Sequence, residues 1–546
     1  MLDRRDTYEA LYRDFRWHIP ERFNIGTAVS DVWAARDPGR TALLEYRVGA
    51  AARQLSFREL SAQSDALAAA LRKLGIQRGD RVALLLPQCF ETAVTHVAIY
   101  KLGAIAVPLA LLFGIEAIEY RLHTAAVRAV VTNAAGAAKL AKIDTRLADL
   151  DVVVSIEGAA GGVRDFHRLV ADHAGGFTAV DTRADDPAMM IFTSGTTGPP
   201  KGALHAHRVL LGHLPGVQMH HEFLPRADDR LWTPADWAWA GGLLNVLLPG
   251  LYLGVPVVAG RFEKFDPEAA LGLAEAMKVR NAFIPPTALR MLKSVPDIRK
   301  RFDLSFRTIG SGGESLGRET FEWAEAELGL AINEFYGQTE CNLVLSSCAA
   351  IGVSRAGAIG LPVPGHTVAV IDDAGRAVPA GETGQIAIAR PDPVMFLEYW
   401  RNPEATARKF IGDWMTTGDQ GTTDADGYVH FFGRDDDVIT SAGFRIGPAE
   451  VEDCLTGHPS IALAAAVGKP DPLRTEIVKA YVVLKDGVEG TTELAEEIRL
   501  FVRERLSAHE YPREVEFVDS MPLTTTGKVI RRIFRDRAKR EVEGAR

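Results

Sequence analysis

The chain has 546 residues, of which 47% are hydrophobic and 24% charged, and its formal net charge at pH 7 is −9. This length predicts several structural units, and the acidic balance argues against a nucleic-acid-binding surface, which is normally basic. Four scattered cysteines without zinc-ligand spacing suit a reducing cytoplasm, and neither a signal-peptide core nor a run of about 20 apolar residues is found. We therefore expect a cytoplasmic protein without a membrane span.

The N-terminal part of the chain alternates expected strands with expected helices. Apolar runs predict strands over residues 41–46, 82–86, 104–107 and 129–132. Between the first two strands, the capping-box pair Ser56 and Glu59 begins a leucine-rich helix that ends at Gly75. Alternation of this kind is typical of an α/β fold with a mainly parallel sheet and helices on both faces.

Residues 193–202, TSGTTGPPKG, form the most informative stretch of the chain. The apolar run before them and the alternating residues 201–207 after them predict a strand–loop–strand unit. Glycines allow backbone N–H groups to converge, and the hydroxyl groups and Lys201 add further donors, which together suit a polyphosphate. A Walker A loop does not fit, because Gly195 and Gly198 are too close together and no Ser or Thr follows Lys201.

Four histidines near this loop raise the question of a metal site. His205 and His207 lie two apart on a predicted strand and therefore share one face, and His220 and His221 follow. No cysteine or carboxylate lies at a matching spacing, so packing and hydrogen bonding are the favoured interpretation.

The pattern changes after residue 367. Short β patterns separated by turns at 373–375 and 426–427 predict a β-rich subdomain. Beyond residue 447 a proline-initiated helix, an amphipathic helix over about 494–506 and a basic helix over 531–540 predict a small C-terminal α+β unit.

The loop at 193–202 resembles the phosphate-loop signature of the adenylate-forming superfamily, which contains acyl- and aryl-CoA synthetases, adenylation domains of peptide synthetases and luciferases. Five more segments resemble the later motifs of that family in the same order, and the resemblance covers residues 41–532: GSGGES at 310–315, NEFYGQTE at 333–340, WMTTGD at 414–419, GRDDDVITSAGFR at 433–445 and PLTTTGKVIRR at 522–532. It implies a large N-terminal domain, 1–433, and a small mobile C-terminal domain, 434–546.

The resemblance also implies a role for individual residues. Lys528 would be catalytic together with Thr339 and Glu340, and Glu340 would hold Mg²⁺. Asp436 would be the hinge, and Gly443 would contact coenzyme A. Nucleotide binding would fall to Thr193, Ser194, Gly195, Thr196, Thr197, Gly198, Lys201, Gly313, Glu314, Ser315, Tyr336, Thr339, Asp419, Arg434 and Arg445.

The implied reaction uses ATP, Mg²⁺ and coenzyme A. A carboxylic acid would first form an acyl-AMP with release of pyrophosphate, and the thiol of coenzyme A would then take the acyl group. Trp239, Gly312 and Gly337 would line the acyl pocket. Acetyl-CoA synthetases carry tryptophan at the position of Gly337, so we expect a deeper pocket that accepts a short- to medium-chain, or branched, acid.

Other functions stay open at this point. An aryl-CoA ligase of the benzoate type, or a ligase that loads a separate carrier protein, would use the same motifs. A non-catalytic nucleotide-binding regulator fits less well, because it has no use for Lys528 and Glu340. Acetylation of Lys528 by an acetyltransferase, reversed by a deacetylase, would remove its charge and switch the enzyme off.

Overall fold

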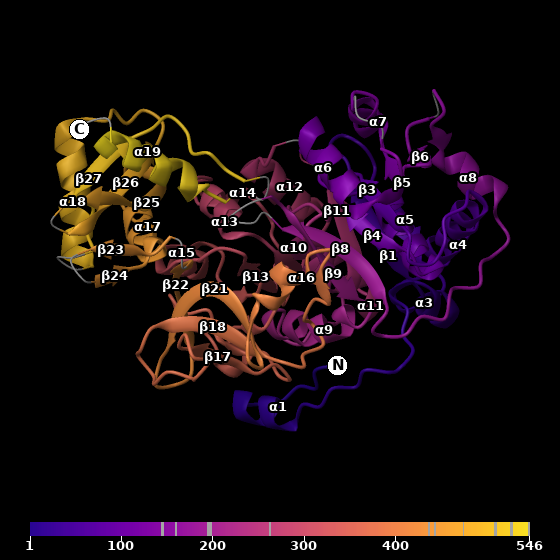
Figure 1. The fold of residues 1–546 in the computed structure, drawn as a ribbon, viewed down its shortest axis with the longest axis horizontal. Coiled ribbons are helices and arrows are strands. Elements are labelled where there is room, and N and C mark those ends of the chain that lie inside the picture. The colour runs from indigo at the N-terminus through magenta and orange to yellow at the C-terminus, as the bar shows by residue number, and fades with distance from the viewer. Residues whose placement is uncertain are drawn as a thin grey trace.

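The computed structural model describes residues 1–143, 147–158, 161–193, 199–260, 262, 264–434, 437–441, 444–472, 474–506, 510–524 and 528–543, with residues 444, 445 and 543 described by their backbone alone. Figure 1 shows a large N-terminal body, coloured indigo to magenta, an orange β-rich part below its centre, and a smaller yellow C-terminal part at one end. This arrangement confirms the α/β fold class expected from the sequence.

The first large sheet has eight strands, most of them parallel. The strand–loop–strand unit expected around residues 193–202 is confirmed, since Thr193 lies opposite Lys201 in an antiparallel pair. In spatial order the strands are β19 (Glu398–Tyr399), β9 (Lys201–Ala206), β8 (Pro187–Thr193), β4 (Ile105–Pro108), β3 (Arg81–Leu85), β5 (Val127–Thr132), β6 (Val152–Ser155) and β7 (Arg164–Asp165).

The second large sheet has nine strands, with a parallel centre and antiparallel edges. β13 and β14 are parallel neighbours whose carboxyl ends lie at the same edge. In spatial order the strands are β16 (Leu361–Pro362), β15 (Leu345–Ser346), β14 (Ile332–Tyr336), β13 (Thr308–Gly312), β12 (Asn281–Phe283), β10 (Leu231–Trp232), β11 (Val257–Gly260), β1 (Thr41–Tyr46) and β2 (Arg53–Ser56).

Two five-stranded sheets complete the fold, and both follow residue 367. The first contains β17 (Val368–Ile371), β18 (Gly384–Ala389), β21 (Trp414–Thr423) and β20 (Phe410–Ile411), with β22 (Val429–Arg434) also paired to β21. The second contains β24 (Phe444–Ile446), β23 (Ile439–Ser441), β26 (Thr475–Leu484) and β25 (Ile461–Asp471), with β27 (Glu514–Phe517) also paired to β26.

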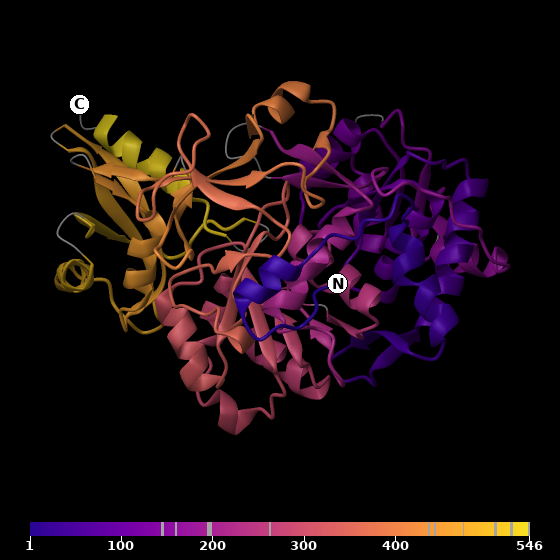
Figure 2. The same ribbon diagram turned by 90° about the horizontal axis from the view of Figure 1, so that it is seen from below.

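Helices surround these sheets (Figures 1 and 2). The predicted capping box of α4 is present, with Ser56 and Glu59 exchanging hydrogen bonds, and Gly103 ends α5 in the left-handed conformation. The helices of the N-terminal body are α1 (Tyr8–Asp14), α2 (Ile25–Val29), α3 (Asp31–Arg36), α4 (Phe57–Lys73), α5 (Phe90–Leu102), α6 (Ile115–Ala125), α7 (Ala134–Leu140), α8 (Phe166–Asp172), α9 (Val209–His220), α10 (Ala240–Gly242), the π-helical turn η1 (Leu243–Leu247), α11 (Leu248–Leu253), α12 (Pro267–Ala276), α13 (Pro286–Leu292), α14 (Ile298–Arg301), α15 (Arg318–Glu327), η2 (Ala349–Ile351) and α16 (Pro403–Ala407).

Three helices belong to the C-terminal part: α17 (Pro448–Thr456), α18 (Thr492–Arg505) and α19 (Arg531–Glu543). A separate apolar core joins α17 and α18 to the last sheet, and Phe534 of α19 stacks on Tyr481 of β26. At the other end of the chain, α1 lies away from the strands that follow it (Figure 2) and is held by Tyr8, whose hydroxyl donates to the Pro362 carbonyl.

The four histidines considered above are buried core residues. Burial lowers the pKa of His205 to about 3 and that of His207 to about 4, so both imidazoles are neutral. His220 stacks on Phe335 of β14 at a ring distance of 4.5 Å. Within the described part of the chain, no helix is long and apolar enough to cross a membrane.

Candidate active site

A cavity of about 810 Å³ lies between the N-terminal body, the β-rich sheet and the C-terminal part. It collects most of the described residues that the sequence nominated, although they come from segments more than 300 residues apart. Those in its wall are Thr193, Lys201, Trp239, Gly313, Glu314, Ser315, Tyr336, Gly337, Thr339, Glu340, Asp419, Arg434 and Lys528.

The ends of strands place these side chains. β13 ends at Gly312 and β14 at Tyr336, so the segments that follow both parallel strands open into the same cavity. Open α/β sheets bind ligands at this edge, outside the carboxyl ends of their strands. Gly313 has φ of +95°, a conformation that favours glycine, and its bare backbone faces the cavity.

Asp419 is a buried carboxylate of the site with three polar partners. It is 5% exposed, and its Oδ2 accepts hydrogen bonds of 2.6 Å from both the Tyr336 hydroxyl and the Gln338 amide. Its Oδ1 lies 3.5 Å from Nη1 of Arg434. Burial raises the pKa of Asp419, while Arg434 and the two donors act in the opposite direction. A carboxylate has about four acceptor positions, so Oδ1 has room for further O–H donors of a ligand.

Glu340 lies near Lys201 in the same wall. It is 7% exposed and accepts a short hydrogen bond from the hydroxyl of Tyr399, while the Lys201 ammonium lies 5.0 Å from the centre of the Tyr399 ring. In the described part of the chain, no three His, Cys, Asp or Glu side chains form a metal-ligand group. Mg²⁺ is commonly bound by one or two carboxylates together with substrate phosphates, so Glu340 is a suitable ligand.

Lys528 reaches the cavity from the C-terminal part. The Thr524 N–H donates a 2.7 Å hydrogen bond to the Lys528 carbonyl. The Nζ of Lys528 lies 3.9 Å from the point that a β-carbon on Gly313 would occupy, so the ammonium stands beside the segment that follows β13. The surrounding protein lowers the pKa of Lys528, although Glu314 and Asp419 oppose that shift and the side chain keeps contact with solvent in the cavity.

Two further acidic side chains, Glu314 and Glu334, line the same cavity as Gly313. Glu314 accepts hydrogen bonds from the Thr287 hydroxyl at 2.9 Å and from Arg290 at 2.8 Å, which orient its carboxylate. Glu334 is buried and accepts from the Leu316 N–H at 3.1 Å. Burial raises the pKa of Glu334 to about 8, so this side chain is protonated at neutral pH.

The expectation for Gly337 requires correction. Gly337 lines the cavity, but a β-carbon on it would lie 1.1 Å from the carbonyl oxygen of Asn342. The volume that a side chain would need is filled by the protein's own backbone, so the absence of a side chain here does not deepen the acyl pocket. Gly312 lies on β13, where a β-carbon would meet the Phe335 carbonyl at 2.5 Å, and it is not among the residues that line the cavity.

Several nominated residues lie outside the described part of the chain. These are Ser194, Gly195, Thr196, Thr197, Gly198, Asp436 and Gly443, and the side chain of Arg445. The backbone of Arg445 pairs with Thr440 in the β23–β24 hairpin.

Sequence reasoning missed several polar residues of the site, among them Gln338, Tyr399 and Arg290. Gln338 stands inside the motif NEFYGQTE and had a visible signal, since an amide next to a predicted adenine- and phosphate-binding segment is a natural donor. Tyr399 and Arg290 had none, because each meets its carboxylate only through tertiary packing, across 59 and 24 residues of chain respectively.

Taken together, the cavity at the strand ends, its buried carboxylate at Asp419 and the lysine inserted from the C-terminal part fit an enzyme of the adenylate-forming fold. The sequence matches the family described as "AMP-binding enzyme" over residues 30–400 and "AMP-binding enzyme C-terminal domain" over residues 450–528. The chain belongs to this family, and it is an AMP-forming acyl-CoA synthetase that uses ATP, Mg²⁺ and coenzyme A.

Relatives with known names are similar to this chain over nearly its full length. The chain is 32% identical to the acetyl-coenzyme A synthetase of Bacillus subtilis, with 97% of the chain and 94% of that protein covered. It is 34% identical to the human mitochondrial acyl-coenzyme A synthetase ACSM2B, with 95% and 91% covered. Among solved structures, the anthranilate CoA ligase AuaEII in complex with anthranoyl-AMP superposes with a TM-score of 0.88 at 29% identity, with 96% and 99% covered.

Proposed function

We propose that this cavity carries out the adenylation step with Lys528 as the residue that brings the acid and the nucleotide together. The supporting observation is the position of Lys528 Nζ, 3.9 Å from the β-carbon position of Gly313, in the same cavity as Tyr336, Glu340 and Asp419. A carboxylate is already ionised at pH 7, so the step needs no general base. Its obstacle is electrostatic, because an anion must approach the polyanion ATP.

The residues in the wall address that obstacle. Asp419 would accept the two ribose hydroxyls and fix the nucleoside, with Tyr336 beside it. Lys201 and Thr193 would hold the outer phosphates, and Glu340 would hold Mg²⁺, which when bound neutralises part of the phosphate charge. Lys528 would then contact both the carboxylate of the acid and the α-phosphate, a preorganised charge of the kind that contributes most to such reactions.

The second step requires a different arrangement of the same site. We infer a large domain, 1–433, and a mobile domain, 434–546, that rotates about Asp436, removes Lys528 and brings Gly443 towards coenzyme A. This division is supported by the sheets, since the β-rich sheet ends with β22 at Arg434 and the last sheet begins with β23 at Ile439. Domain movement of this kind allows one cavity to serve two reactions.

Three aromatic residues of the cavity wall support an acid with an apolar body as the substrate. Phe192, Trp239 and Phe335 line the cavity, and Trp239 packs edge-on against Phe113 at 5.5 Å. Because these rings offer apolar surface to a substrate, we propose a monocarboxylic acid of short to medium chain length, with branching allowed.

An aromatic acid is the second candidate. The same three rings offer faces and edges for a benzoate-type ring, and aromatic pairs contribute about 0.5–1.5 kcal/mol beyond area burial. The anthranilate CoA ligase that superposes with a TM-score of 0.88 favours this alternative.

The experiment that tests both candidates is a CoA-dependent AMP-release assay across acetate to decanoate, branched acids and benzoates. Each methylene buried in an apolar pocket contributes about 0.8 kcal/mol, so a four-carbon acid, with two more methylenes than acetate, should exceed acetate by roughly tenfold or more in kcat/KM. Preference for benzoate would select the aryl-CoA ligase. AMP release with an acyl-carrier protein but not with coenzyme A would overturn the proposed acceptor.

The accessibility of Lys528 from the cavity also suits the proposed regulation. Acetylation would neutralise the ammonium and stop adenylation, so an acetyltransferase and a deacetylase are proposed partners. An enzyme acetylated at Lys528 that retained its pyrophosphate-exchange rate would refute this proposal. We propose the cytoplasm as the compartment, as the scattered cysteines suggest.

A further inference from the structure

The inference concerns the contact between α15 of the N-terminal body and α17 of the C-terminal part. α15 begins at Arg318, and its N-cap residue, Gly317, has no side chain to accept the free N–H groups of the first turn. The Oδ2 of Asp453 accepts the Arg318 N–H at 3.0 Å. A carboxylate from one domain therefore caps a helix of the other.

The local geometry is built to admit this carboxylate. Gly317 has φ of +80°, and a β-carbon on it would lie 1.9 Å from Oδ1 of Asp453. A second close approach lies at the other end of the same contact, where a β-carbon on Gly457 would lie 2.8 Å from Oε1 of Glu319. Two glycines, one on each side, thus allow α15 and α17 to meet at side-chain contact distance.

Helix α17 also contacts the segment that carries Lys528. Glu452, the neighbour of Asp453 on α17, accepts a 2.7 Å hydrogen bond from Nε of Arg531 and pairs with its Nη2 as well. Arg531 lies three residues beyond Lys528. The C-terminal part therefore contacts one short segment of the N-terminal body at two points. Lys528 lies beside Gly313, and α17 contacts Gly317, four residues further along the chain.

We propose that Asp453 is a positioning residue for adenylation: by capping α15 it holds the C-terminal domain in the arrangement that keeps Lys528 in the cavity. This inference rests on the proposed function. An Asp at a helix N-terminus satisfies a free N–H and interacts favourably with the helix dipole. When the domain turns away for the second step, α15 loses its cap, so the contact favours only the adenylation arrangement.

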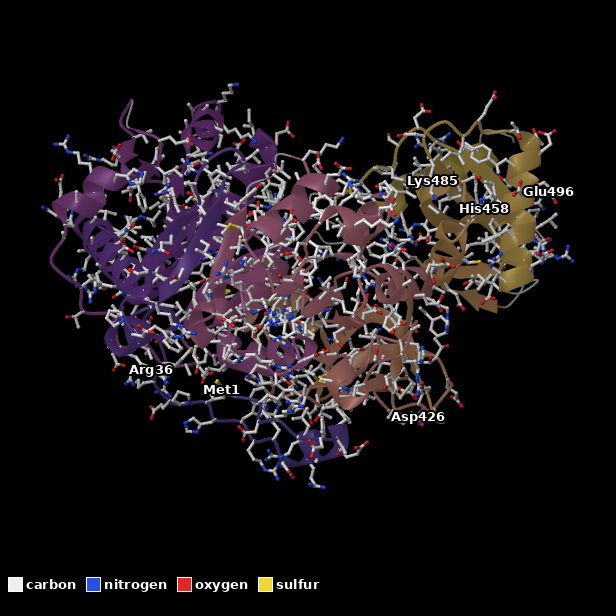
Figure 3. All side chains as sticks on the ribbon, turned by 180° about the vertical axis from the view of Figure 1, so that it is seen from behind. Met1, Arg36, Asp426, His458, Lys485 and Glu496 are labelled. Atoms are coloured by element: carbon white, nitrogen blue, oxygen red, sulfur yellow. The ribbon has the colours of Figure 1, made fainter. Side chains whose placement is uncertain are left out.

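The experiment compares Asp453→Ala with Asp453→Asn, since asparagine caps helices about as well as aspartate. For Asp453→Ala we expect acid-driven ATP–pyrophosphate exchange to fall roughly 2- to 30-fold, the range for a lost cap. Conversion of supplied acyl-AMP to acyl-CoA should be unchanged, and Asp453→Asn should stay within about threefold of wild type in both. The matched control is Glu496→Ala, an exposed carboxylate at the outer edge of the C-terminal domain (Figure 3), which should change neither step.

Hydrogen–deuterium exchange provides a readout that does not depend on activity. Peptides covering residues 316–324 and 528–535 should exchange faster in Asp453→Ala than in wild type, and at the wild-type rate in Asp453→Asn. Equal losses in both half-reactions, unchanged exchange of these peptides, or an asparagine variant as impaired as the alanine variant would overturn the proposal. Absence of acid-driven exchange in wild type would instead overturn the proposed function, and the peptide data would still decide the role of Asp453.

Discussion

Replacing Lys528 tests the proposed mechanism most directly. Lys528→Met keeps the length of the side chain and removes its charge. An ammonium about 4 Å from one anionic charge interacts by about 4 kcal/mol at an effective dielectric constant of about 20, and part of this interaction already exists before the reaction. We therefore expect the rate of acyl-AMP formation to fall about 10²- to 10³-fold, as for other preorganised charge contacts.

The assay separates the two half-reactions. Acid-driven ATP–pyrophosphate exchange reports acyl-AMP formation, and thioester formation from supplied acyl-AMP and coenzyme A reports the second step. Lys528→Met should impair the first and spare the second, because in the proposed mechanism the second step takes place after Lys528 has left the cavity. A variant that loses both steps to the same degree would refute the reasoning, since Lys528 would then support the fold or both reactions.

The pH dependence of the first step provides an independent test of the same residue. The surrounding protein lowers the pKa of Lys528 below the ordinary lysine value of 10.5. In the proposed mechanism the protonated form of Lys528 is the active one. The rate of pyrophosphate exchange should therefore be at its maximum below that lowered pKa and should fall as pH rises through it. Lys528→Arg stays charged because the guanidinium pKa exceeds 12, so any exchange activity that it retains should extend to higher pH. An unchanged alkaline limb in that variant would assign the limb to another group.

Three further predictions concern other residues of the cavity wall. Asp419→Asn should raise the KM for ATP by roughly 10- to 100-fold and reduce the preference for ATP over 3′-deoxy-ATP in pyrophosphate exchange; an unchanged preference would remove Asp419 from the ribose site. Gly337→Ala should lower the thermal unfolding midpoint, since overpacking against the Asn342 carbonyl costs about 1–3 kcal/mol. The same variant should leave the order of preferred acids unchanged. A shift of preference towards acetate would show that Gly337 does shape the acyl pocket. The pKa of Glu334 is raised from 4.5 to about 8, so as pH rises the unfolded state loses this proton before the folded state does, and wild-type stability should fall between these two values. Glu334→Gln does not titrate, so its free energy of unfolding should gain on the order of 3 kcal/mol relative to wild type from pH 5 to pH 8. Thermal midpoints of the two proteins that change in parallel between these pH values would contradict this prediction.

The parts of the site that the sequence predicted are those fixed by local patterns. Thr193 and Lys201 could be placed on facing strands because an apolar run and an alternating run flank one loop, and the pairing of these two residues confirms it. Such features depend on the periodicity of neighbouring residues and need no knowledge of distant contacts.

The features that escaped prediction depend on atoms far apart in the sequence. Tyr399 reaches Glu340 from an edge strand, and Asp453 meets Arg318 across 135 residues. Gly337 is the clearest example, because the motif gave its identity and a comparison with tryptophan-bearing relatives suggested free volume. A glycine leaves a free volume only where no neighbouring atom occupies the position of a side chain, and at Gly337 the Asn342 carbonyl occupies it.

The distribution of contacts between the two domains follows from the chemistry proposed for the cavity. The groups proposed to bind the nucleoside would be needed in both half-reactions, and Asp419 and Tyr336 lie on the β-rich sheet and the N-terminal body, where a hydrogen bond joins them. A cation between two anions is useful only until the acyl-AMP forms, and afterwards it would occupy the path of the thiol. In the proposed mechanism, placing Lys528 on a separate domain allows it to leave, and the helix cap that Asp453 supplies is a contact weak enough to break at each turnover. A stronger interdomain contact would favour adenylation but slow the exchange of arrangements, so a variant with tighter contact between α15 and α17 should accumulate acyl-AMP on the enzyme.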